Sequence, residues 1–207
     1  MDSNRKMVHC LVLGLLVLML LCYSPLSGQV LTGMIGLRTG INHNAFVDQN
    51  GNQWSDWGRH IGIEVGVSIT RSLKLVTGVS YLATKYSYVP DTTVYYKKDT
   101  KEYSNLYVPC RLRINLWTIG FLQPNIEIGW TFIKQYSGFR QIEYHIPFRY
   151  PIPGEELRAD FGLLCGLGIK VNVIRYFAII PNIHYQRNLG EEDTYHLLFS
   201  LGISYGD

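Results

Sequence analysis

The stretch HIGIEVGVSIT, residues 60–70, alternates between apolar and small or polar side chains with a period of two. Such alternation is typical of a β-strand with two unlike faces. The odd-numbered positions are all β-branched and apolar, and they are Ile61, Ile63, Val65, Val67 and Ile69. A soluble sandwich would cover its wet face with Lys, Glu and Thr, whereas here that face carries repeated glycine around Glu64. The pattern therefore indicates a strand whose apolar face meets lipid.

The same alternation occurs eight times along the chain. The expected strands are residues 33–46, 60–70, 73–88, 105–116, 125–133, 160–172, 176–187 and 194–205. Each is long enough to cross a membrane as a tilted strand, which takes about 9 to 11 residues. The seventh is the least regular, because Pro181 interrupts it.

The connections between these strands differ in length in a regular way. Long connections are expected at 47–59, 89–104 and 134–158, and short ones near Arg71, at 117–121 and at 173–175. Short periplasmic turns and longer outer loops are typical of outer-membrane barrels. The sequence therefore predicts an all-β fold, an eight-stranded antiparallel up-and-down transmembrane β-barrel with a side-chain-filled interior. The fold-level alternative is a soluble periplasmic β-sandwich.

The N-terminus has the pattern of a secretory signal. A basic segment at Arg5 and Lys6 precedes an uncharged apolar run at 7–22, and the small residues Ser27 and Gly28 follow. We expect a signal peptide at 1–28 and a barrel domain at 29–207, with export to the cell outer membrane. A membrane anchor is the alternative, although the apolar run is short for a span.

Charge and cysteine content exclude some classes of function. The chain has 19 Lys and Arg against 16 Asp and Glu, which is too balanced to indicate a nucleic-acid partner. The expected barrel keeps Cys110 and Cys165, both on apolar faces of strands that are not neighbours in a meander. We predict free, lipid-facing thiols.

Charged side chains recur on the faces predicted to point inward. They are Arg38, Glu64, Lys74, Arg111, Arg113, Glu127, Asp160 and Lys170. Because a buried charge without a partner costs several kcal/mol, we expect Glu64 and Glu127 to be held by the three arginines. The network is interpreted as a structural plug; a narrow solute or ion channel is the alternative.

Aromatic residues suggest two further features. Trp117, Phe121, Tyr176 and Phe177 are predicted to form one interfacial girdle, and Tyr86, Tyr88, Tyr103, Tyr107, Trp130 and Phe132 the other. The connection at 134–158 contains three prolines and several aromatics, which favours a defined protein-binding surface. Its candidate partner-binding residues are Phe139, Tyr144, Phe148 and Tyr150.

Catalytic motifs are not found in the sequence. There is no HExxH, CxxC or GxSxG, and no glycine-rich phosphate loop, so we expect no enzyme, metal or cofactor. The enzymatic alternative is a lipid-modifying site at the barrel wall, with His184 and His196 on adjacent strands.

Several short motifs resemble the small outer-membrane β-barrel family of Bacteroidota, which includes PorT-like proteins. These motifs are GxxxGxN at Gly36, Gly40 and Asn42, the segment from Leu106 to Pro109, and DxGxxxGxG from Asp160 to Gly168. The resemblance implies an outer-membrane location with lipid around the barrel, no enzymatic activity for most members, and an accessory role in an outer-membrane secretion machinery. The chain departs from the family at its end, where Gly206 and Asp207 follow Tyr205. The leading functional hypothesis is a structural or interaction barrel that acts through its long outer loops.

Overall fold

The computed structural model describes residues 32–90, 97–144, 147–190 and 193–206. The expected signal peptide lies outside the described residues. The strands are β1 (Gly33–Val47), β2 (Gln53–Ser68), β3 (Leu73–Tyr88), β4 (Lys98–Asn115), β5 (Leu122–Glu143), β6 (Pro147–Pro151), β7 (Ala159–Ile174), β8 (Phe177–Asn188) and β9 (Asp193–Tyr205), and a short 3-10 helix, η1 (Gly154–Glu156), precedes β7. Among the described residues, no helix is long and apolar enough to cross a membrane.

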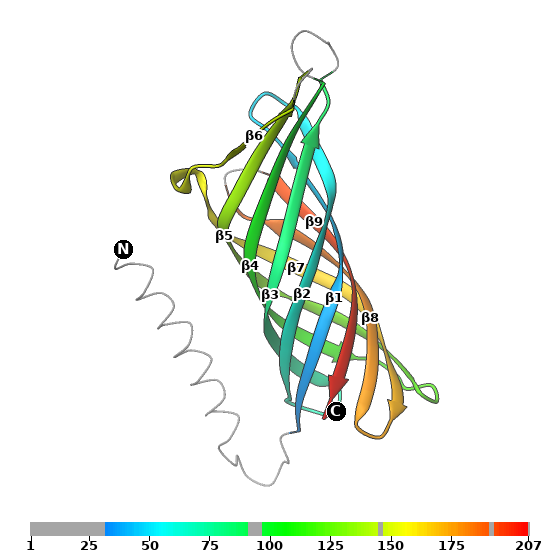
Figure 1. The fold of residues 1–207 in the computed structure, drawn as a ribbon. Coiled ribbons are helices and arrows are strands. Elements are labelled where there is room, and N and C mark those ends of the chain that lie inside the picture. Colours follow the sequence, from blue (N-terminus) through cyan, green and yellow to red (C-terminus); the bar gives the residue numbers. More distant parts are fainter. Residues whose placement is uncertain (1–31, 91–96, 145–146, 191–192, 207) are drawn as a thin grey trace, which may run out of the picture. The chain divides into compact units, whose positions relative to one another are not determined.

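Eight of these strands close into a barrel, as predicted (Figure 1). Each pairs antiparallel with its neighbour, β4 pairs with β5 and β5 with β7, and β1 closes the ring by pairing with β9. The short strand β6 pairs with β5 beyond the end of β7, so it adds to the wall at one end only. Closure leaves no sheet edge within the barrel, which a lipid environment requires.

The two faces of the wall are those that the alternation predicts. Ile61 and Ile63 are 60% and 54% exposed on the outside, whereas Glu64 between Ile63 and Val65 is 5% exposed and points inward. Val76 and Leu82, which break the alternation of their strand, are both fully buried in the interior. Glycine is required where neighbouring groups approach the backbone closely: a Cβ at Gly40 would overlap the carbonyl oxygen of Phe199 and the ring of His60.

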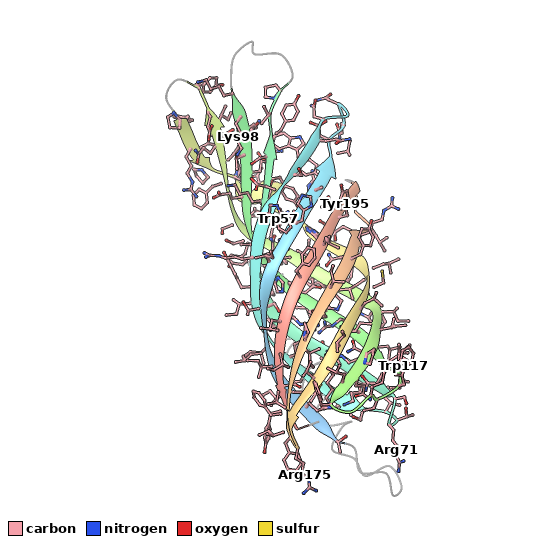
Figure 2. All side chains as sticks on the ribbon, turned by 90° about the vertical axis from the view of Figure 1, so that its right-hand side faces the viewer. Trp57, Arg71, Lys98, Trp117, Arg175 and Tyr195 are labelled. Carbon is pink, nitrogen blue, oxygen red and sulfur yellow. The ribbon has the colours of Figure 1, made fainter. Side chains whose placement is uncertain are left out.

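The two ends of the barrel differ. The turn end carries the short connections 69–72, 116–121 and 175–176, in agreement with the sequence, and Figure 2 shows Arg71, Trp117 and Arg175 there. At the opposite end, the loop end, the strands continue further than predicted. β2 starts at Gln53, β4 starts at Lys98 and β5 runs to Glu143, so strand continues into each of the three expected long loops.

The extra length forms a projecting sheet of β3, β4, β5 and β6, which extends beyond β7 and β9 (Figure 1). A β-bulge where Ser104 and Asn105 face Ser137 and Gln135 marks its base. Sequence alternation missed this sheet because charged and aromatic residues occur on both of its faces, so side-chain polarity no longer follows the pleat, while the backbone ladder continues.

The predicted loop-side girdle is partly wrong. Tyr86 and Tyr107 are 6% and 5% exposed and point into the barrel, where they pack on other side chains. Their inward positions follow from strand parity, since Leu82 and Arg111 share those faces. Trp57 and Tyr195 lie on the outer wall instead, well short of Lys98 at the loop end (Figure 2). Cys110 and Cys165 are free, as predicted.

Candidate functional site

A cluster of buried charges fills the middle of the barrel. Glu127 on β5 is fully buried and accepts hydrogen bonds from Arg111 Nη1 at 2.9 Å and Arg113 Nε at 2.7 Å. Glu64 on β2 accepts one from Arg111 Nη2, and its Oε1 lies 2.6 Å from Nε of Arg38 on β1. Arg111 therefore bridges both carboxylates, and three arginines compensate two acids. Because each acid has at least two cationic neighbours, the cluster can stay ionised in a site of low dielectric.

His184 on β8 completes this cluster, and the sequence did not place it there. Its Nε2 lies 2.7 Å from Glu127 Oε2, and its Nδ1 lies 3.4 Å from Nη1 of Arg38. A guanidinium can only donate, so Nδ1 is the acceptor and the proton sits on Nε2, which donates to Glu127. Strand parity alone could have placed His184 inward, since it shares its face with Asn182 and Gln186, both buried.

The remaining predicted charges lie away from the two carboxylates. Lys74 and Lys170 are each 6% exposed near the turn end, and Lys74 is directly opposite Arg113 in the pairing of β3 with β4. Asp160 is at the start of β7 near the loop end, where it lines a cavity. The structure thus gathers Arg38, Glu64, Arg111, Arg113 and Glu127 into one cluster, with Lys74 and Lys170 on its Arg113 side and Asp160 at the loop end.

Polar and apolar layers close the interior on the loop side of this cluster. Five buried side chains form an apolar cluster in the lumen, and they are Leu82, Tyr107, Ile133, Leu164 and Leu198. His60 bonds Ser200 at 2.9 Å, and His196 Nδ1 lies 2.8 Å from Asn44 Oδ1. His184 and His196 are 1% and 2% exposed inside the barrel rather than at its lipid face. Within the described part of the chain, no group of three or more His, Cys, Asp or Glu is arranged to hold a metal ion.

A cavity of about 310 Å³ opens at the loop end above these layers. Acidic and basic groups line it together, among them Lys101, Glu155, Glu156, Arg158 and Asp160. Lys101 Nζ lies 4.8 Å from the ring centroid of Trp54 and 5.7 Å from that of Phe46, so its charge rests on aromatic faces.

An ion pair links β4 to β5 within the projecting sheet, where the Asp99 side chain is 1% exposed and the Arg140 side chain 37% exposed. Arg140 on β5 donates from Nη2 to Asp99 Oδ2 at 2.6 Å, and its Nε lies 3.1 Å from both carboxylate oxygens. Asp99 is 1% exposed, and its charge raises the pKa of the Arg140 guanidinium through this hydrogen bond. This fork-to-carboxylate geometry ties β5 to β4 across the strand pair of the projecting sheet.

Three of the four candidate partner-binding residues lie in strands of the β5–β6 hairpin, Phe139 on β5 and Phe148 and Tyr150 on β6, while Tyr144 is in the connection between them. Phe139, Tyr144 and Phe148 are 42%, 46% and 62% exposed, and Tyr150 is half-buried. The Arg149 guanidinium lies 4.7 Å from the Phe139 ring centroid, and the rings of Phe148 and Tyr150 are 5.8 Å apart. The strand pairing places Phe139 with Arg149 on one face of the hairpin and Phe148 with Tyr150 on the other, so the hairpin holds exposed aromatics in fixed positions on both faces.

The free edge of β6 is protected by proline. Ile152 N donates to Gly138 O, so in the antiparallel register Phe148 and Tyr150 turn their backbone groups toward β5. Pro147, Arg149 and Pro151 therefore face outward, and only Arg149 of these has an N–H to offer. Proline at such positions prevents another strand from pairing with the edge.

Comparison with known proteins identifies the fold. No family model matches the chain, and no curated protein matches its sequence. The solved outer-membrane protein OprG of Pseudomonas aeruginosa is similar, with a TM-score of 0.54 and 11% identity over 86% of this chain and 98% of OprG. Neisserial surface protein A aligns with a TM-score of 0.50 and 12% identity over 84% of this chain and 97% of the other. The chain therefore shares the fold of small outer-membrane β-barrels.

Proposed function

We propose that this chain is an outer-membrane barrel that works as a structural or interaction protein, with the β5–β6 hairpin as its partner-binding surface. Residues 1–28 direct export as a signal peptide, and lipid surrounds the apolar wall. The observation that carries the proposal is the exposure of Phe139 and Phe148 on a hairpin that projects beyond the barrel wall.

The filled interior supports this role over transport. Salt-bridged arginines and glutamates occupy the middle of the lumen, and the apolar cluster around Leu82 lies beside them. An eight-stranded barrel has room for little more than its own side chains. We therefore assign partner binding to the loop end, where the projecting sheet stands clear of the wall.

The blocked edge of β6 defines how a partner is recognised. Strand addition needs a row of free N–H and C=O groups, and Pro147 and Pro151 remove two of the three outward donors. Recognition therefore depends on the side chains of Phe139, Phe148 and Arg149. Aromatic and arginine side chains are the residue types that most often dominate interface energies.

The finer part of the proposal concerns the kind of partner. The resemblance of the strand motifs to the PorT-like family of Bacteroidota suggests an accessory component of an outer-membrane protein secretion machinery. A rigid projecting sheet suits a stable place in such an assembly, because little conformational entropy is lost on docking.

The test is purification from native membranes in mild detergent, with an affinity tag after Gln29. Wild type is compared with Phe139→Ser/Phe148→Ser, and with Val89→Ser/Leu189→Ser as the control. Val89 and Leu189 are apolar residues that are 63% and 62% exposed, so they match the hairpin phenylalanines as exposed apolar side chains. After cross-linking, wild type and the control variant should each recover a stoichiometric partner, and the hairpin variant should lose it. The heat-modifiable migration of all three proteins should stay the same. Equal recovery from all three proteins would refute the assignment.

A further inference from the structure

Buried polar side chains at the loop-end cavity keep hydrogen-bonding atoms turned toward its space. Asn105 on β4 is 1% exposed, and its Nδ2 donates to Leu82 O at 2.8 Å and to Thr84 Oγ1 at 3.1 Å. Its Oδ1 has no partner among the described residues and stays accessible from the cavity. Asn188 on β8 is 7% exposed, and its Oδ1 accepts from Gln186 Nε2 at 2.7 Å, which leaves Nδ2 as a donor toward the cavity.

Strand β9 adds two side chains to this lining. His196 is 2% exposed, and its Nδ1 lies 2.8 Å from Asn44 Oδ1. Asn42 Nδ2 donates to the same oxygen at 2.6 Å, so this oxygen is an acceptor and Nδ1 of His196 carries the proton. Nε2 of His196 is therefore an acceptor, and no described residue donates to it. The Thr194 side chain is 9% exposed and makes no hydrogen bond within the described part of the chain.

These four side chains reach the cavity from opposite sides of the barrel, because β4 and β9 are four strands apart in either direction round the ring. Asn105 Oδ1 and His196 Nε2 accept, Asn188 Nδ2 donates, and a hydroxyl does both. An anion can only accept and an ammonium group can only donate, so neither satisfies this set. A ligand with several hydroxyl groups matches all of it.

Aromatic rings form another part of the cavity lining. Phe46, Tyr86 and Tyr103 line it, and the rings of Phe46 and Tyr86 meet edge to face with their centroids 4.9 Å apart. The C–H groups of a sugar ring carry a small positive charge, and the face of an aromatic ring is negative, so the two attract when they pack together. Charges of both signs complete the lining, which favours a neutral ligand over a strongly charged one, and they belong to Lys101, Glu155, Glu156, Arg158 and Asp160.

We propose that this cavity binds one ring of a neutral sugar, with its hydroxyl groups bonded to the four buried polar side chains and its C–H face on the aromatic lining. The volume of about 310 Å³ is at the lower end of the roughly 300–1,000 Å³ of ligand pockets, which suits a single ring. The longer connections of outer-membrane barrels face the outside of the cell. A free sugar and the end of a surface glycan offer the same ring there, and the test separates them.

The experiment is saturation-transfer NMR on the full chain in phosphatidylcholine nanodiscs, which avoid sugar-based detergents. The probes are the methyl glycosides of glucose, galactose, mannose and N-acetylglucosamine, each compared with a trisaccharide that ends in the same sugar. We expect at least one glycoside to receive saturation, and neither sulfate nor spermidine to displace it. Equal affinity of glycoside and trisaccharide assigns a free sugar, and tighter binding of the trisaccharide assigns a glycan end. Saturation of no sugar, or displacement by either ion, would overturn the proposal.

Matched threonine variants locate the binding site. Thr194→Val removes the hydroxyl at nearly constant shape and should weaken sugar binding about fivefold, which corresponds to one net hydrogen bond. Thr131→Val is the control, because Thr131 is fully buried in the barrel, its hydroxyl also has no partner among the described residues, and it does not line the cavity. Wild-type affinity in Thr194→Val, or the same loss in both variants, would overturn the assignment to this cavity.

Displacement on the wild-type chain decides the question if Thr194→Val fails to fold. Thr194 lies on β9, outside the β5–β6 hairpin. Loss of sugar binding and loss of the protein partner are therefore measured on different variants, so this proposal and the proposed function fail independently.

Discussion

Neutralising Glu127 tests whether the interior charges hold the barrel together. In Glu127→Gln the shape is kept, but Arg111 and Arg113 lose a carboxylate at 2.9 and 2.7 Å in a fully buried site. Breaking a buried pair in this way costs about 3–5 kcal/mol. That is a large part of the roughly 5–15 kcal/mol by which folded proteins are stable. We therefore expect the largest loss of stability of any single acidic-to-amide change in the barrel.

The assay is urea unfolding of the chain in lipid vesicles, followed by tryptophan fluorescence and by heat-modifiable migration. With a slope of about 2 kcal/mol per molar urea, the midpoint should fall by about 2 M. Glu102→Gln is the matched control, because Glu102 is 43% exposed and pairs with Arg149 at 3.1 Å at the surface. The Glu102→Gln variant should lose less than about 1 kcal/mol of unfolding free energy. A Glu127→Gln midpoint no lower than that of the control would refute the reasoning.

Three further results are expected. Hydrogen bonding from the Asn52 side chain lowers the pKa of Asp48 to about 2. The stability that the Asp48 carboxylate gives the β1–β2 turn should therefore be fully present above about pH 4 and lost as the pH falls through about 2. A carboxyl titration followed by NMR would measure this. Arg140→Met should leave Asp99 buried without its partner, and protease should then cut the hairpin faster while the barrel unfolds as before. Leu82→Ala should cost about 2–5 kcal/mol in the same urea assay, since Leu82 is fully buried.

The wall could be predicted because lipid imposes a strict pattern on it. Ile61 and Ile63 alternate with Gly62 and Glu64, and only a strand with one apolar and one filled face explains that order. The same parity placed the predicted charges on the inner face. The register that pairs Arg111 with both Glu64 and Glu127 could not be predicted, because strand tilt and shear bring together residues from β2, β4 and β5.

The projecting sheet could not be predicted for the opposite reason. Residues 98–104 of β4 and 137–143 of β5 carry charges and aromatics on both faces, so no period of two survives in their sequence. The bulge at Ser104 also shifts the pairing by one residue there. Phe139 and Phe148 were identified as exposed aromatics, but their hairpin geometry had no signal in the sequence.

The position of the charge cluster along the chain has a consequence for barrel assembly. All five of its permanently charged members lie on β1 to β5, and its one later member is His184 on β8. Charge compensation therefore does not depend on the seam where β1 meets β9. A curled sheet of the first five strands already neutralises the ions of this cluster, and β7 carries its inner-face charges, Lys170 and Asp160, toward the two ends of the barrel and away from the two carboxylates.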